Sequence, residues 1–356
     1  MKQYTVVISD VEDYDAGFRG TKAFWWLSSY VGAYAQLGLY WFLTAYFGRS
    51  NVQLLRPSEL LDRKAKLKTD MLFVGIPTHL NAQHLAGIKF NQLVLYDASD
   101  NNELNFSFSD RPFLESQTDV CLKNWRDDRW QETLKIALLP IKRPPWNNRL
   151  RNALNLESLG KSFGRATQKC FDVGFVARPT GSLTTNQRLR WLVEISTNRP
   201  DFKLWGGLVG DSYMREVAEK EVPTAILQNL WLNKKKIGFQ SYFEGLRQSK
   251  VALAPSGYAP WTYRHFEAIY AGCVVVSNDL SHYEFLVPFP RETMVEVGDH
   301  ESVTPAIDRA LSMLDKSPNI AHENRMYLGR WLDRGKYSHK CKDTLDRFFG
   351  QLNRAA

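Results

Sequence analysis

The chain has 356 residues, of which 44% are hydrophobic and 24% are charged. That composition is typical of a soluble globular protein, and the length predicts two α/β domains rather than one core. The net charge of +8 suits anionic partners such as nucleotide sugars, acidic glycans, anionic membrane surfaces or nucleic acid. Four cysteines without paired spacing indicate a reducing compartment and argue against a disulfide framework or a CxxC metal site.

The N-terminal region has no visible signal peptide, but residues Ala23–Gly48 carry no charge and are long enough to span a bilayer. Serine, glycine, glutamine and threonine residues interrupt this segment, which favours a buried helix of the first domain. We therefore expect a cytoplasmic protein, with peripheral contact to a membrane surface as an open alternative.

The first half alternates short apolar runs with more polar, helix-like segments. The expected strands are Tyr4–Ser9, Val52–Leu55, Met71–Ile76, Leu93–Tyr96 and Asp119–Trp125, and a charged helix is expected over Ser58–Lys68. Thr133–Ile141 is expected to be the last segment of this half. This alternation predicts a Rossmann-like domain over residues 1–145. The polar, weakly periodic residues 146–169 predict a linker.

The second half shows the same alternation and predicts a second Rossmann-like domain over residues 170–337. Its expected strands are Phe171–Ala177, Phe202–Trp205, Val251–Ala254, Cys273–Ser277 and Met294–Val297. Its expected helices are Thr185–Ser196, Tyr213–Leu232 with an interruption at Pro223, Ser241–Gln248, Thr262–Ala271, Pro305–Leu314 and Ala321–Trp331. Gly206–Gly207 is expected to form a turn, and a last helix is expected over Lys340–Leu352.

The most informative stretch is Lys250–Asp279, which reads as strand, loop, helix and strand. Such a unit belongs to a parallel sheet, in which the loops at the carboxyl ends of the strands carry ligands. Arg264 and Glu267 are three residues apart and share one helix face. The free N–H groups of the helix start, beside a cation, can hold a diphosphate, and the carboxylate can accept hydrogen bonds from a ribose diol. The alternative is an ordinary crossover helix with a surface ion pair between these two residues.

The two runs SKVALAPSG, from Ser249, and YRHFEAIYAGCVVVSND, from Tyr263, resemble the donor-binding segment of GT-B glycosyltransferases. The exostosin-like branch, with its Pro-x-Gly loop and Arg-x-x-Glu-Ala helix, is the most similar. The resemblance is close over Ser249–Asp279 and rests elsewhere on architecture. It implies an α/β protein with two Rossmann-like domains facing across a cleft, and a C-terminal helix, at about residues 338–356, that crosses back to the first domain.

The resemblance also implies which residues bind a nucleoside-diphosphate sugar. Arg264 and the helix start would hold the diphosphate, and Glu267 would hold the ribose. The full implied set is Arg178, Arg188, Ser256, Gly257, Thr262, Tyr263, Arg264 and Glu267. Arg178 and Arg188 carry over only by position, in the first loop and helix of the second domain.

Glycosyl transfer needs a stabilised leaving diphosphate, which GT-B enzymes usually provide without a metal. We therefore expect no metal and no cofactor besides the sugar nucleotide. An inverting enzyme also needs a general base, for which Asp97 is the first choice, followed by His79 and Asp10. Alternatively, Asp97 caps a turn, His79 caps a helix and Asp10 lies in a solvated acidic loop; a retaining enzyme would need none of them as a base.

These expectations favour a glycosyltransferase that acts on a glycan of cell-surface or secreted type. The sequence leaves two alternatives open. One is a viral-type glucosyltransferase that modifies DNA, and the other is a non-catalytic module that binds a nucleotide or a glycan.

Overall fold

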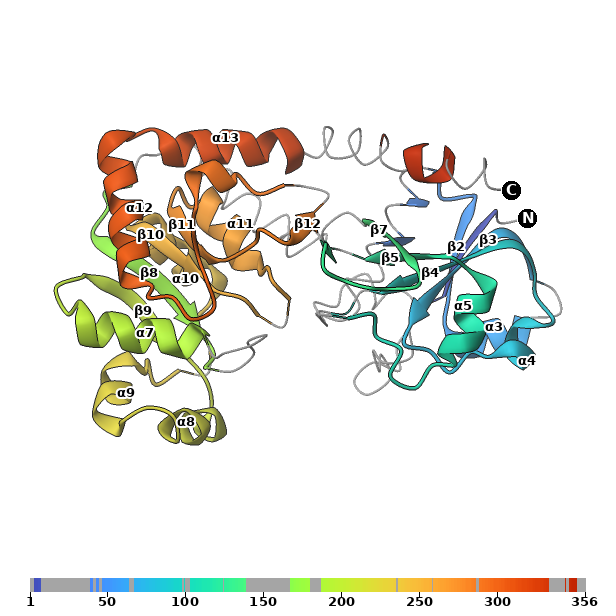
Figure 1. Ribbon diagram of the computed structural model, residues 1–356, viewed down its shortest axis with the longest axis horizontal. Coiled ribbons are helices and arrows are strands. Elements are labelled where there is room, and N and C mark those ends of the chain that lie inside the picture. Colours follow the sequence, from blue (N-terminus) through green and yellow to red (C-terminus); the bar gives the residue numbers. More distant parts are fainter. Residues whose placement is uncertain are drawn as a thin grey trace. The chain divides into compact units, whose positions relative to one another are not determined.

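In the computed structural model the chain forms two compact units (Figure 1). The described residues are 3–7, 39–40, 43–44, 47–63, 67–97, 99, 103–123, 125–138, 167–179, 187–234, 236–257, 259–285, 288–332, 343 and 346–350. Unit 1 consists of Met1–Ala153, Tyr283–Pro288 and Trp331–Ala356, and unit 2 of Leu154–His282 and Phe289–Arg330. The chain therefore returns to unit 1 twice after leaving it.

Unit 1 is built on a six-stranded parallel sheet with the strand order β2-β1-β3-β4-β5-β7. The strands are β1 (Tyr4–Val7), β2 (Val52–Leu55), β3 (Lys68–Ile76), β4 (Lys89–Asp97), β5 (Val120–Lys123) and β7 (Lys135–Leu138). The helices are α3 (Pro57–Arg63), α4 (Ala82–Leu85) and α5 (Arg111–Gln117). A separate antiparallel pair joins β6 (Trp125–Asp127) to β12 (Tyr283–Phe285).

Both faces of this sheet are covered, because neighbouring residues of a strand point to opposite faces and both sets are apolar here. Val74 and Leu95 belong to a core that includes residues of α3, α4 and α5. Phe73 and Tyr96 belong to a second core on the other face, together with Phe349 near the end of the chain. The ring of Phe349 lies 6.1 Å from that of Tyr4 and 4.8 Å from that of Phe47.

Unit 2 is built on a five-stranded parallel sheet with the order β13-β11-β10-β8-β9. The strands are β8 (Phe171–Ala177), β9 (Leu204–Leu208), β10 (Ser249–Ala254), β11 (Val274–Asn278) and β13 (Val295–Val297). The helical segments are α7 (Gln187–Asn198), α8 (Ser212–Glu219), α9 (Thr224–Leu230), α10 (Phe239–Arg247), α11 (Tyr263–Tyr270), η2 (Arg291–Thr293), α12 (Thr304–Lys316) and α13 (Ile320–Leu332).

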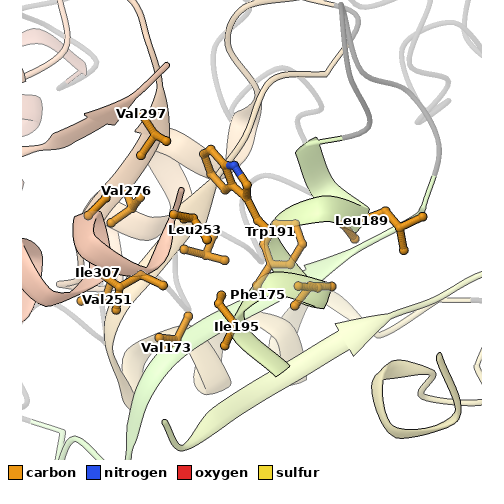
Figure 2. Packing of buried hydrophobic residues seen from close by; sticks show 14 of the residues in the cluster. Val173, Phe175, Leu189, Trp191, Ile195, Val251, Leu253, Val276, Val297 and Ile307 are labelled. Atoms are coloured by element: carbon orange, nitrogen blue, oxygen red, sulfur yellow. The ribbon is translucent and has the colours of Figure 1, made fainter. Parts of the chain in front are cut away.

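The main core of unit 2 lies between one face of this sheet and helices α7 and α12 (Figure 2). Trp191 of α7 is fully buried there, beside Phe175 of β8 and Leu253 of β10. Helix α10 contacts β10, and helix α11 contacts both β10 and β11. Fully burying aromatic and branched side chains of this size contributes about 1.5–3 kcal/mol each, so the strands are held firmly.

Each sheet has one strand-order reversal. Numbered from its own first strand, each sheet begins with the order 2-1-3-4-5, because the second strand lies on one side of the first and the third strand on the other. The reversal falls between β1 and β3 in unit 1 and between β8 and β10 in unit 2. Loops at the carboxyl ends of such a strand pair form the ligand crevice in open α/β sheets.

Two local predictions were wrong. The helix expected over Ser58–Lys68 ends earlier, because Lys68 already begins β3. Gly206–Gly207 lies within β9 instead of forming a turn, with φ angles of 103° and 142°. A Cβ on Gly206 would lie 2.0 Å from the carbonyl oxygen of Phe175, so the glycine permits close backbone approach between strands.

No helix among the described residues is long and apolar enough to cross a bilayer. Most of the uncharged segment Ala23–Gly48 lies outside the described residues. Most of the expected last helix, Lys340–Leu352, does so as well, although residues 346–350 are helical.

Candidate functional site

The carboxyl edge of β8 and β10, at the reversal of the unit 2 sheet, collects most of the residues that the sequence singled out. The loop after β10 carries Ser256 and Gly257, and it leads into α11 with Arg264 and Glu267. The start of α7 carries Arg188, and Arg178 directly follows β8. The fold thus brings these residues to one sheet edge although they are widely separated in the sequence.

A buried amide anchors the loop after β10. The Oε1 atom of Gln187 accepts hydrogen bonds from the backbone N–H and the hydroxyl of Ser256, at 3.3 and 3.0 Å. Its Nε2 atom donates to Asp299, 3.1 Å away in the loop between β13 and α12. Gln187 is fully buried, and its hydrogen bonds join the segments that follow β8, β10 and β13. Sequence reasoning missed it, because a lone glutamine near a helix start carries no distinctive signal.

Gly257 makes room for an arginine of α7. A Cβ at this position would lie 2.9 Å from Nη2 of Arg188, so a larger residue would displace the guanidinium. Arg188 therefore lies against the loop after β10, and the glycine has a steric reason to be there. Arg178 is exposed, so its side chain is accessible beside the same strand end.

The start of α11 is fixed by an unexpected residue, His265. The backbone N–H of Thr262 donates to Nδ1 of His265 at 3.1 Å. With Nδ1 as the acceptor, the ring proton is on Nε2, which donates to the hydroxyl of Ser277 in β11 at 2.7 Å. The backbone N–H of His265 donates to the carbonyl oxygen of Thr262 at 3.1 Å. The N–H groups before it, at the helix start, are of the kind that suits an anion. Tyr263 lies in this turn; its side chain is not among those described.

Burial lowers the pKa of His265 to about 3, with the Thr262 contact opposing the change and Arg264 adding to it. We therefore predict that the imidazole stays neutral from pH 8 to pH 5. An ordinary histidine would become protonated in this range. The ring carbon and proton chemical shifts in an NMR titration test this, with exposed His282 as the internal comparison. A titration midpoint near pH 6.5 for His265 would contradict a buried ring that accepts the backbone N–H of Thr262.

Arg264 reaches across to β8. Its Nη2 atom donates to the carbonyl oxygen of Val176 at 2.9 Å, and its guanidinium carbon lies 5.0 Å from the centre of the Phe175 ring. The Nε and Nη1 atoms are buried without a hydrogen-bond partner. Buried donors of this kind cost about 1–3 kcal/mol each unless a water, an ion or a ligand accepts from them.

Glu267 lies one helical turn beyond Arg264 and is half-buried. Burial raises the pKa of its carboxyl group, while Arg264 and the hydroxyl of Tyr242 in α10 oppose that rise. Since Nη2 of Arg264 bonds to Val176 and its other two nitrogens have no partner, the two residues do not form the hydrogen-bonded surface pair left open by the sequence. The two side chains therefore attract each other electrostatically without a direct hydrogen bond between them.

In unit 1, Asp97 ends β4 and forms an ion pair with Lys123 at the end of β5, with 2.7 Å between Oδ2 and Nζ. Both side chains have no exposed surface. Asp97 also accepts the backbone N–H groups of Ser99 and Asn105, at 2.8 and 3.1 Å. A general base must reach the hydroxyl that it deprotonates. This geometry therefore favours the alternative in which Asp97 caps a turn.

His79 follows β3, at the strand-order reversal of the unit 1 sheet, and its side chain is exposed. Its ring stacks on that of Phe108, with 4.2 Å between the ring centres and 24° between the planes. Phe108 is itself 42% exposed. Asp10 lies outside the described residues, so its predicted role stays a prediction.

The sequence matches no protein-family model and no curated protein. Solved structures with a similar fold span nearly the whole chain. An α,α-trehalose 6-phosphate synthase from Burkholderia multivorans has a TM-score of 0.52 at 12% identity, over 100% of this chain and 98% of the other. A UDP-forming synthase from Burkholderia xenovorans has a TM-score of 0.52 at 13% identity, over 99% of both chains. HepE of Anabaena, solved with UDP, has a TM-score of 0.52 at 12% identity, over 99% of this chain and 100% of the other.

At this level of identity the likeness shows the fold, which is a mixed α/β fold with two Rossmann-like domains of the GT-B type. The expected fold class is confirmed to this extent. The parallel sheets of both units agree with it.

Proposed function

We propose that this protein is a glycosyltransferase that takes a sugar from a nucleoside-diphosphate donor bound at the β8–β10 edge of unit 2. The observation that carries the proposal is the placement of Arg264 and Glu267 in the opening turns of α11, beside the loop anchored by Gln187. A guanidinium with two unpartnered donors suits a diphosphate, and a half-buried carboxylate suits a ribose diol. The GT-B fold supports this division of roles.

Uridine diphosphate is the donor nucleotide that we propose. The structures with a similar fold include UDP-forming synthases and a UDP complex, which favours a uridine nucleotide. The resemblance of Ser249–Asp279 to exostosin-like enzymes supports a glycan acceptor. On this proposal the leaving diphosphate is stabilised by Arg264, with Arg178, Arg188 and the N-terminus of α11, and without a metal.

For an inverting reaction, we propose His79 ahead of Asp97 as the base that deprotonates the acceptor. His79 is exposed at the strand-order reversal of unit 1, whereas Asp97 is buried and already accepts three hydrogen bonds. The adjacent exposed ring of Phe108 offers an apolar surface to a sugar ring. Replacing His79 by glutamine is expected to lower turnover without weakening donor binding, which steady-state kinetics and calorimetric titration with UDP measure.

The test is a thermal-shift screen with UDP, GDP, ADP and their sugars, each measured with and without EDTA. A ligand at 100 times its Kd stabilises the native state by about 2.7 kcal/mol, so binding is read directly from the rise in Tm. We expect uridine nucleotides to raise Tm, EDTA to leave the rise unchanged, and UDP to be released from UDP-sugars when acceptor glycans are added. A shift that disappears with EDTA would contradict the metal-free mechanism, and no shift with any nucleotide would contradict the donor site.

A further inference from the structure

The hydroxyl of Tyr242 is a buried polar group that the proposed function does not yet use. Tyr242 lies in the first turn of α10, which packs against α11. The hydroxyl oxygen is buried and has no hydrogen bond of ordinary length and angle. Its charged neighbours are the carboxylate of Glu267 and the guanidinium of Arg264, both on α11.

This arrangement places two incompletely satisfied side chains beside a carboxylate. The Tyr242 hydroxyl and the Nε and Nη1 atoms of Arg264 are buried without a hydrogen-bond partner, and the carboxylate of Glu267 is the neighbour of both side chains. The strands beneath α11 add apolar surface on this face through Ala252, Ala254 and Val275, which are fully buried and lie on the opposite face from the core under α7 and α12. An isolated buried hydroxyl would cost about 1–3 kcal/mol, so a tyrosine is disfavoured here unless its hydroxyl gains a partner in another state.

Hydrogen bonds at binding sites are often long or poorly aligned without ligand and shorten once the ligand is bound. We propose that Tyr242 is the positioning residue for Glu267: its hydroxyl donates to one carboxylate oxygen and so directs the ionised carboxylate at the ribose diol of the bound nucleotide. This inference rests on the proposed function for the donor site. It adds a residue from α10 that the resemblance in Ser249–Asp279 does not include.

The proposal has a consequence for pH. Burial raises the pKa of Glu267, and the interaction with Tyr242 opposes that rise. Removing the hydroxyl should raise the pKa of Glu267 further, so that the carboxylate is protonated at a higher pH. The groups that face Glu267 are Tyr242 from α10 and Arg264 from α11; β10 and β11 contribute no titratable group to this face.

The experiment compares wild-type protein with Tyr242→Phe and with Tyr213→Phe as a matched control. Tyr213 is 70% exposed on α8, so its hydroxyl is already solvated. The affinity for UDP is measured by calorimetry from pH 8.5 to pH 5. We expect Tyr242→Phe to bind nearly as well as the wild type at pH 8.5, where Glu267 is ionised in both proteins. On the acid side it should bind about tenfold more weakly, because the carboxyl group of the variant is protonated at a higher pH than that of the wild type. The terminal phosphate of UDP also titrates in this range, but that effect cancels when the affinities of variant and wild type are compared at the same pH.

A second measurement needs no nucleotide. Since the folded-state pKa of Glu267 is raised, ionising its carboxyl group lowers stability as the pH rises through that pKa. The loss in urea midpoint caused by Tyr242→Phe should therefore grow from pH 4 to pH 8, and that of Tyr213→Phe should not. An equal loss at every pH, in stability and in UDP affinity, would mean a purely structural role and overturn the proposal. If the loss grows with pH but the wild type binds no UDP, the coupling to Glu267 stands and the donor-site assignment fails.

Discussion

Replacing Lys123 by methionine is expected to lower the free energy of unfolding by about 3–5 kcal/mol, the cost typical of breaking a buried ion pair. The substitution keeps much of the side chain's volume but leaves the ionised Asp97 fully buried with only two backbone N–H donors. Urea unfolding followed by tryptophan fluorescence measures the effect. Trp125 and Trp130 lie close to Nζ of Lys123, with 5.3 and 5.7 Å to the ring centres.

The matched control is Arg126→Met, which breaks an ion pair of nearly the same length. Arg126 and Glu284 are 2.6 Å apart, but their side chains are 42% and 49% exposed. We expect this control to cost no more than about 1 kcal/mol, because water solvates both charges after the pair is broken. Equal losses in the two variants would show that burial does not set the strength of the Asp97–Lys123 pair.

A substitution in the Asp97–Lys123 pair also distinguishes the two roles considered for Asp97, a turn cap and a general base. Asp97→Asn should destabilise unit 1 by leaving Lys123 buried without its counter-charge. Turnover per folded molecule should change little. General base catalysis contributes about 10²–10⁴-fold, so a loss of that size in fully folded Asp97→Asn protein would restore Asp97 as the base.

Replacing Arg264 by alanine is expected to weaken UDP binding by about 10- to 150-fold, which corresponds to one or more hydrogen bonds between charged groups. The guanidinium is the only group of α11 with buried donors that lack a partner among the described residues of that helix. Calorimetric titration with UDP measures the change. The fold should persist, since the substitution removes one hydrogen bond to Val176 and one contact with the Phe175 ring at a strand end.

Arg199→Ala is the control for this experiment. Arg199 also lies over an aromatic ring, with 3.7 Å from its guanidinium carbon to the centre of the Phe202 ring. Its nitrogens, however, are paired with Asp201 and Asp308, which leaves it little capacity for an anion. Wild-type affinity is expected in Arg199→Ala, and wild-type affinity in Arg264→Ala would refute the diphosphate site.

The strands and the helix that carry this site could be predicted from the sequence, because their signals are local. Val52–Leu55 and Phe171–Ala177 were predicted with their observed limits, and α11 within one residue at each end. Buried apolar runs and a terminating glycine suffice for such predictions. Local signals failed at Gly206–Gly207, where a turn was predicted and a strand is found. Glycine is common in turns, but it also occurs in strands where two backbones come close together.

The contacts that hold the site in place could not be predicted, because they join distant parts of the chain. Gln187 and Ser256 meet only after β8 and β10 have paired. Asp97 and Lys123 become partners because their strands are neighbours in register, and strand order is not written in any local pattern. Tyr242 and Glu267 approach each other through the packing of α10 on α11. For the same reason the sequence could not show that Asp97 is inaccessible.

The position of Phe349 in the unit 1 core has a consequence for how the protein is made. Its ring packs with those of Tyr4 and Phe47, and it is 9% exposed. During synthesis the ribosome releases these early residues long before Phe349, and all of unit 2 emerges in between. The part of this apolar face that Phe349 covers, at the rings of Tyr4 and Phe47, therefore stays uncovered while the second half is made. That interval is when we expect the chain to depend most on chaperones, because uncovered apolar surface promotes aggregation.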